Sequence, residues 1–374
     1  MRIVMLSMRP TVQGPIPKHT PILVDAIRRL GHEVTLLPWG RGREHESRLE
    51  KLVARPMDIA RARRIVQGGG VDVLVVKTAH DWRTLVRDIA LVAMVRRACP
   101  QVVVQFHGSQ ADRLAQPGDR LFKLASAYLL RLSSGALVLS SDERRHWQAL
   151  CPTRAVRIVD NPMVPLPDPG PGEPSWRRRL PAAQPVVLFV ARLIAEKGVF
   201  DLLEAFTRLR GRAHLLVVGD GPERGRAQAR AASLGIGDDV TFTGYLSGGE
   251  LTSAYQAAAV LALPTTFDEG FPTVIAEAMQ VGLPIVTTRI RGMADRLREG
   301  GSTLFVPARD PEALAEALER LLADPALRAA MGAASRDELR ALAPDAVGRR
   351  YVEALAEVMQ SAKAGGVGCD RSGW

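Results

Sequence analysis

Short runs of apolar residues alternate along the chain with longer segments in which apolar and polar residues recur at helical spacing. The runs VVVQF (102–106), VVLFV (186–190) and PIVTT (284–288) are continuous enough to be buried strands. The segment VFDLLEAF (199–206), which follows the second run, reads as the start of an amphipathic helix. Strands that alternate with helices along nearly the whole length predict an α/β fold with parallel sheets covered by helices on both faces.

A proline-rich stretch divides this pattern into two halves. NPMVPLPDPGPGEPSWRRRLPAAQP (161–185) cannot form a regular helix or a central strand, because proline has no N–H to donate. We therefore expect two domains, a linker and a last helix. In chain order these parts are a first domain (1–162), a linker (163–183), a second domain (184–345), a last helix (about 346–361) that is expected to return to the first domain, and a flexible tail (362–374).

Length and cysteine usage limit the class of protein. The 374 residues are enough for two domains with sizeable cores. Cys99, Cys151 and Cys369 are few and odd in number, so we expect no disulfide framework and a reducing compartment. No apolar run reaches the length of a membrane span. MRIVMLSM (1–8) reads as a first strand rather than a signal peptide, so a cytoplasmic location is expected.

The most informative segment is PTTFDEGFPTVIAEAMQVGLPIVTT (264–288). Pro272 suits the first position of a helix and Gly282 suits its end. Glu269 then lies in a strand-to-helix turn, and Glu277 lies on the helix itself. A helix start offers free N–H groups to an anion, and carboxylates accept hydrogen bonds from hydroxyls. This combination suits a ligand that carries both phosphates and sugars.

A second segment joins another buried strand to a helix through Arg192, Glu196, Lys197 and Gly198. Arginine offers a fork of donors and lysine a compact charge, so the basic pair could bracket a diphosphate. A surface pair engaged in salt bridges is the alternative interpretation.

Together the two segments resemble the Glu-x7-Glu motif and the Arg-Leu-x-x-Glu-Lys-Gly segment of retaining glycosyltransferases with two Rossmann-like domains. This is the GT-B fold of family 4, also called glycosyl transferases group 1. The resemblance implies that Glu269 faces the donor sugar and that Glu277 binds the ribose hydroxyls. It also implies that Arg192 and Lys197 hold the donor diphosphate, and that these two residues act in catalysis together with Glu269. Further donor contacts are implied at the helix start, by Gly270, Phe271, Pro272 and Thr273.

Two other turns of the second half are similar to the same family. Gly219 ends a strand in HLLVVGDGPERGRAQ (214–228), where Gly225 comes one place late for a dinucleotide motif. The resemblance implies that Gly219 lines the nucleotide and that Gly244 and Tyr245 contact the base. A tight turn at the sheet edge is the alternative for Gly219.

In the first half, VVVQFHGSQAD (102–112) places His107 at the carboxyl end of a strand, where α/β folds bind ligands. A histidine there can position a sugar hydroxyl or shuttle a proton, and the resemblance makes His107 catalytic, beside the reacting sugar. A histidine satisfied by local hydrogen bonds is the alternative. Asp112 and Gly14, the latter in a loop before a helix expected from about Thr20, are candidates for acceptor binding together with His107. His19, His80 and Asp81 also end or follow strands, and their claims are weaker.

The net charge of +10 is concentrated in the first half. Residues 1–160 carry 26 Lys+Arg and 14 Asp+Glu, which gives +12, and the remainder carries −2. Because the first domain receives the acceptor in the family, this charge indicates an acidic acceptor or a membrane rich in anionic lipid. Segments 51–66 and 120–132 could lie on a membrane, although Pro56 should break or kink the first. Alternatively, both helices cover a sheet with their charges in solvent, and arginine is favoured by composition.

The resemblance predicts transfer of a hexose-type sugar from a UDP- or GDP-sugar to a hydroxyl of an acceptor sugar or glycolipid, with retention of configuration. No metal ion and no other cofactor are expected, since the leaving diphosphate can act as the base. The expected setting is glycolipid or cell-surface polysaccharide synthesis, with peripheral contact at the inner face of an anionic membrane. Nucleic acid is not an expected partner, because aromatic residues are only 5%. A non-catalytic nucleotide-sugar-binding subunit and a sugar-nucleotide epimerase of the same fold are the alternatives.

Overall fold

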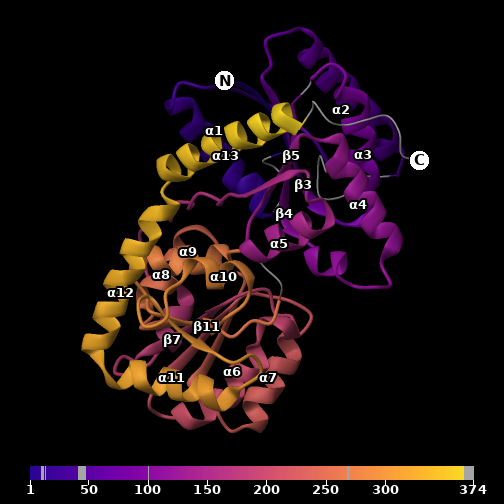
Figure 1. Cartoon of the computed structure of the whole chain (residues 1–374). Helices are drawn as coiled ribbons and strands as arrows, with labels where there is room; N and C mark the ends of the chain where they lie inside the picture. Colours follow the sequence, from indigo (N-terminus) through magenta and orange to yellow (C-terminus); the bar gives the residue numbers. More distant parts are fainter. Residues whose placement is uncertain (10–11, 13, 41–47, 100, 268–269, 366–374) are drawn as a thin grey trace. The chain divides into compact units, whose positions relative to one another are not determined.

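The chain folds into two compact units, each built on one parallel sheet (Figure 1). The computed structural model describes residues 1–9, 12, 14–40, 48–99, 101–267 and 270–365. Unit 1 is Met1–Pro162 with Leu342–Trp374, and unit 2 is Met163–Ala341. The α/β architecture predicted from the alternating pattern is confirmed in both units.

The sheet of unit 1 has six strands in the order β2-β1-β3-β4-β5-β6, all paired in parallel. They are β1 (Arg2–Ser7), β2 (Glu33–Pro38), β3 (Val73–His80), β4 (Val102–Ser109), β5 (Gly135–Val138) and β6 (Ala155–Ile158). The chain builds outward from β1 to β2 and then returns to β3 on the other side of β1. The carboxyl ends of β1 and β3 are therefore a topological switch point, where such sheets bind ligands.

Helices cover the two faces of this sheet around separate cores. On one face, α1 (Pro15–Arg29) and α13 (Pro344–Gly365) pack side by side, although they come from opposite ends of the chain (Figure 1). Their core joins Met5 and Val103 of the strands to Ile27 and Leu355 of the helices. The other face is covered by α2 (Arg48–Gln67), α3 (Trp82–Val95), α4 (Arg120–Leu132) and α5 (Ser141–Leu150), with the short 3-10 helix η1 (Ala111–Leu114) before α4.

Three expectations for unit 1 were wrong. Helix α1 begins at Pro15 rather than near Thr20, because a proline in the first turn gives up no intrahelical hydrogen bond. Helix α2 continues through Pro56, held by buried residues such as Ala62. Helix α13 runs to Gly365, so residues 362–365 are helical and not part of a tail, since Ala and Lys favour helix. The remaining tail, 366–374, lies outside the described residues.

The sheet of unit 2 also has six parallel strands, in the order β12-β11-β10-β7-β8-β9. They are β7 (Val186–Val190), β8 (His214–Val218), β9 (Val240–Gly244), β10 (Val260–Leu263), β11 (Ile285–Thr288) and β12 (Thr303–Val306). The helices are α6 (Val199–Phe206), α7 (Arg224–Ser233), α8 (Gly248–Ala257), α9 (Thr273–Val281), α10 (Arg291–Arg296), α11 (Pro311–Ala323) and α12 (Pro325–Leu339). Here β7 and β10 are neighbours and mark the switch point, because β8 and β9 continue on one side and β11 and β12 on the other.

The proline-rich segment expected as a linker (163–183) packs along unit 2. The Gln280 side chain on α9 donates to Val164 O at 2.9 Å and accepts from Leu166 N at 3.0 Å. Trp176, in a short 3-10 helix of this segment, is 2% exposed. A proline-rich backbone cannot join a sheet, so side chains of unit 2 satisfy its polar groups instead. None of the helices in the described ranges combines the length and the apolar character that crossing a bilayer requires.

Candidate functional site

The loops after β7 and β10 are joined through one backbone carbonyl. Glu196 O accepts hydrogen bonds from Thr266 N at 2.7 Å, Phe267 N at 3.2 Å and Thr265 Oγ1 at 3.1 Å. Two sequence segments that are about 70 residues apart therefore form one surface at the switch point of unit 2.

Gly198 allows these loops to approach each other. Its φ is 80°, and a Cβ at this position would lie 2.1 Å from Pro264 O. Any other residue would combine a disfavoured left-handed backbone with a clash against another backbone. The glycine directly precedes α6 and follows Lys197, so it also sets the position of that lysine.

Lys197 lies where the loops after β7 and β10 meet and contacts both loops. Its ammonium sits over the Phe267 ring, 4.5 Å from the ring centroid. Burial lowers the pKa of Lys197 from 10.5 to about 8, so the side chain is mostly charged at pH 7 and gains from a nearby anion. Arg192, also after β7, is exposed to solvent. The predicted basic pair thus occupies the carboxyl end of β7.

The ends of β7, β8 and β9 are also held together by backbone contacts. A Cβ at Gly219 would lie 1.9 Å from Ala191 O, so glycine is required where the β8 turn crosses the β7 turn. Gly219 N donates to Gly244 O at 2.8 Å, which adds the end of β9. Tyr245 follows directly and is 69% exposed. Gly219 therefore lies in a close-packed turn at the same sheet edge as the basic pair. Tyr245 offers an uncovered ring beside this edge.

Helix α9 begins at this edge, next to β10. Pro272 is its N-cap rather than its first residue, and Thr273 is its first. Gly282 ends the helix in the left-handed conformation at φ 77°, where glycine is favoured. Gly270 and Phe271 precede the helix and are half-buried. Glu269, the expected sugar-facing residue, lies outside the described residues together with Asp268.

Glu277 lies in the second turn of α9 and is 8% exposed. The hydroxyl of Tyr255, on the neighbouring α8, donates to Glu277 Oε2 at 2.7 Å. Burial, and then the negative charge of Glu277, hold the pKa of Tyr255 well above its usual range, so the phenol keeps its proton. Tyr255 fixes the orientation of the carboxylate. Sequence reasoning missed it, because nothing distinguishes this tyrosine from an ordinary core residue of α8.

Unit 1 holds a separate polar layer beneath the carboxyl ends of β3 and β4. Lys77 on β3 is the register partner of Gln105 on β4, and His107 follows two positions later on the same face. Tyr351 of α13 donates to Gln105 Oε1 at 2.8 Å. Among the described residues, Lys77 Nζ, Gln105 Nε2 and both ring nitrogens of His107 are buried without a hydrogen-bond partner. Buried polar groups are rarely left unpaired, so this layer could receive further polar atoms.

His107 is a neutral ring in this environment. Burial, and then the positive charge of Lys77, hold its pKa well below its usual range. A neutral histidine can accept or donate one proton, as the predicted role requires. His107 lies within β4, which continues to Ser109, rather than just beyond the strand.

Most of the weaker candidates in unit 1 have structural roles. His80 is buried between Phe106, Phe122 and Trp147 and bonds Ser109 and Ser126 at 3.0 and 2.9 Å. Asp81 caps α3, and His19 lies within α1 instead of after a strand, bonded to Pro162 O at 2.8 Å. Gly14 is the N-cap of α1, and Asp112 lies in the 3-10 helix η1.

The predicted donor residues that the structure describes therefore meet at one edge of unit 2, while His107, Gly14 and Asp112 belong to unit 1. Within the described ranges, no group of three or more His, Cys, Asp or Glu side chains is arranged to hold a metal ion.

Comparison with known proteins identifies the fold and a family that matches part of the chain. The family model "Glycosyl transferases group 1" matches residues 173–338. Sucrose-phosphate synthase from Thermosynechococcus elongatus superimposes with a TM-score of 0.72 at 20% identity, covering 96% of this chain and 99% of that one. HepE from Anabaena, in a structure with UDP and glucose, gives a TM-score of 0.69 at 18% identity, covering 96% and 100%. At these identities the two structures show the shared GT-B fold alone.

Curated relatives resemble the chain over different lengths. The alpha-D-kanosaminyltransferase of Streptomyces kanamyceticus is 32% identical over 62% of this chain and 63% of its own length. The chain thus spans less than two thirds of that relative. The GDP-mannose-dependent alpha-(1-6)-phosphatidylinositol monomannoside mannosyltransferase of Mycobacterium tuberculosis is 26% identical over 87% of this chain and 84% of its own length. Residues 173–338 therefore match the glycosyl transferases group 1, and the fold of both units is GT-B.

Proposed function

We propose that the protein transfers a hexose from a UDP- or GDP-sugar to an acceptor hydroxyl with retention of configuration, and that it needs no metal ion. The observation that carries this proposal is the meeting of Arg192, Lys197, the start of α9 and Glu277 around the β7–β10 switch point. This edge offers two cations and the positive end of a helix to a diphosphate, and a fixed carboxylate to a ribose.

Each group has a distinct role in the proposed reaction. Arg192, Lys197 and the N-terminus of α9 stabilise the negative charge that develops on the leaving diphosphate. Because protein cations and a helix terminus supply this stabilisation, a metal ion is unnecessary. Glu277, oriented by Tyr255, accepts hydrogen bonds from the ribose hydroxyls.

The sugar and the acceptor complete the proposal. Glu269 orients the sugar hydroxyls, and His107 of unit 1, whose pKa burial holds well below its usual range, can accept or donate one proton. The acceptor hydroxyl attacks from the same face as the leaving group, whose own phosphate oxygen takes the proton, so that the configuration is retained.

The known relatives favour this class of donor and acceptor. HepE was solved with UDP-glucose, and the mycobacterial relative is a GDP-mannose-dependent enzyme that acts on a phosphatidylinositol monomannoside. We therefore extend the proposal to an acceptor in glycolipid or cell-surface polysaccharide synthesis, and to a cytoplasmic protein in contact with the inner face of a membrane.

The test is release of nucleotide from a panel of UDP-, GDP- and ADP-sugars without acceptor, with and without EDTA. We expect slow release from one donor, unaffected by EDTA and at least tenfold slower in Lys197→Ala and in Glu277→Gln. Lys363→Ala, at an exposed position of α13, is the matched control and should keep the rate. Loss of release with EDTA would refute metal independence. No release from any donor, although UDP or GDP still raises the Tm, would indicate a non-catalytic nucleotide-sugar-binding subunit.

A further inference from the structure

The outer surface of helices α2, α3 and α4 exposes large apolar side chains. Nine large hydrophobic residues in the described part of the chain are exposed, and seven of them lie on these three helices. They are Met57, Trp82, Val86, Met94, Leu121, Leu124 and Tyr128. The other two, Tyr245 and Phe267, line the donor edge of unit 2. Exposed apolar residues that gather in one place mark an interaction surface, whereas scattered ones do not.

These seven residues belong to one continuous helical layer. Helices α2 and α3 pack together, as do α3 and α4, along one side of unit 1 (Figure 1). Trp82 at the start of α3 meets Phe122 at the start of α4 edge-on, with ring centroids 5.5 Å apart. At the other ends of the two helices, Met94 and Tyr128 line one surface hollow of about 860 Å³. Inner residues of the same helices fill the core, so this layer is apolar on both sides.

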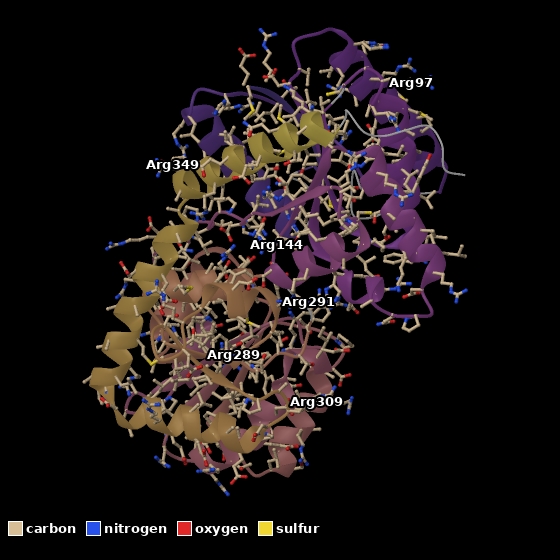
Figure 2. All side chains as sticks on the ribbon, viewed as in Figure 1. Arg97, Arg144, Arg289, Arg291, Arg309 and Arg349 are labelled. Atoms are coloured by element: carbon tan, nitrogen blue, oxygen red, sulfur yellow. The ribbon has the colours of Figure 1, made fainter. Side chains whose placement is uncertain are left out.

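The same layer is strongly basic. Residues 54–67, 82–97 and 120–132 carry 11 Arg or Lys and 2 Asp. Both acids are already paired, Asp58 with Arg55 at 3.4 Å and Asp88 with Arg87 at 2.8 Å. The other nine cations form no ion pair with any residue that the structure describes. They are Arg61, Arg63, Arg64, Arg83, Arg96, Arg97, Arg120, Lys123 and Arg131. Figure 2 shows one of them, Arg97, at the surface where the chain leaves α3.

We propose that the outer face of α2–α4, the docking face, binds a lipid bilayer that contains anionic lipid. The aliphatic side chains and Trp82 would enter the boundary between headgroups and acyl chains, where tryptophan and tyrosine are favoured. The nine cations lie on the same three helices and meet the negative surface potential of the bilayer. Arginine stems are long enough to keep the charge among the headgroups while the stem lies along apolar surface.

Charge and composition favour a bilayer over other occupants. A second copy of the chain would bring nine unpaired cations against nine more, which opposes association of two identical faces. A nucleic acid would match the charge, but Leu121, Leu124, Val86 and Met94 give it nothing to pair or stack with. A bilayer satisfies the cations and the aliphatic groups together. This inference rests on the membrane contact included in the proposed function and names the surface that makes it. It does not depend on the transfer reaction, because the docking face involves no donor-binding residue.

Vesicle binding tests the docking face directly. The full chain is mixed with vesicles of phosphatidylcholine alone or with added phosphatidylglycerol, and the bound fraction is measured by co-sedimentation. We expect binding only with phosphatidylglycerol. Binding should weaken as the salt concentration is raised from about 0.1 to 0.5 M, because salt screens the charges. Each basic residue contributes about fivefold, so Arg96→Gln/Arg97→Gln should weaken binding about 25-fold. Leu121→Ser/Leu124→Ser should weaken it at least tenfold in low salt.

A matched arginine pair provides the control. Arg178 and Arg179 are also adjacent and exposed, but lie in unit 2. Arg178→Gln/Arg179→Gln should bind vesicles like the wild type, and the rise in Tm with UDP should be equal in all variants, which shows that they are folded. Equal binding to both vesicle types, or equal loss in both arginine pairs, would overturn the proposal. A dimer in light scattering that Leu121→Ser/Leu124→Ser dissociates would assign the face to a second copy instead.

Discussion

Replacing Tyr255 by Phe removes a single hydroxyl and tests how Glu277 is held. The two side chains are buried, 0% and 8% exposed, and their hydrogen bond is 2.7 Å long. A hydrogen bond to a charged acceptor contributes about 1.5–3 kcal/mol, and a phenylalanine ring cannot donate one. We therefore expect the free energy of unfolding of unit 2 to fall by about 2 kcal/mol.

The same change should weaken binding of the nucleoside part of the donor. If Glu277 accepts from the ribose, a carboxylate that Tyr255 no longer orients loses about 1 kcal/mol of this interaction, so the Kd for UDP should rise about fivefold. Inorganic pyrophosphate has no ribose, and its Kd should stay unchanged. In Lys197→Ala, by contrast, both ligands should bind more weakly.

Calorimetric titration of UDP and pyrophosphate into each variant separates these effects. Tyr351→Phe is the matched control, because this buried hydroxyl donates to the neutral Gln105 Oε1 at 2.8 Å in unit 1. It should cost about 1 kcal/mol of stability and leave UDP binding unchanged. Equal weakening of UDP and pyrophosphate in Tyr255→Phe would refute the assignment of Glu277 to the ribose.

Three further outcomes are expected. Because burial lowers the pKa of Lys197 to about 8, UDP affinity should fall as the pH rises above 8, and a flat titration profile would exclude a charged Lys197 from the diphosphate site. Gly198→Ala should lower the Tm and the donor affinity together, since its Cβ would lie 2.1 Å from Pro264 O. Gly300→Ala, at φ 71° with no atom within 4 Å of the added Cβ, should change only the Tm. Equal effects of the two variants in thermal-shift and UDP titrations would contradict this. Burial lowers the pKa of Lys77 from 10.5 to about 7. The unfolded chain therefore holds this proton more tightly, and the free energy of unfolding should rise between pH 7 and 10.5. Urea unfolding should show that Lys77→Met loses this rise, and identical pH profiles of the two proteins would contradict the burial of Lys77.

Local chemistry accounts for the parts of the site that sequence reasoning predicted well. Gly282 ends α9 as expected, and Pro272 precedes it by one place as the N-cap, because a proline near the first turn and a left-handed glycine after the last are decided by the residues themselves. The apolar runs at 186–190 and 284–288 are strands of one parallel sheet, as predicted.

Predictions failed where packing outweighed local preference. Pro56 lies within α2, since burial of Ala62 and its neighbours stabilises the helix beyond it. The segment 163–183 reads as a linker from its prolines, yet unit 2 supplies side chains that hold it.

The sequence by itself determined the α/β class, the placement of Arg192 and Lys197 after a strand and that of Glu277 on a helix, because these depend on apolar periodicity and on turn residues close in the chain. Only the tertiary structure decided that the β7 and β10 loops share the Glu196 carbonyl and that Tyr255 holds Glu277. It also decided that apolar side chains of α2, α3 and α4 remain uncovered on one basic layer. The physical reason is that strand order and helix packing join residues far apart in the chain, and no local pattern records which of them will meet.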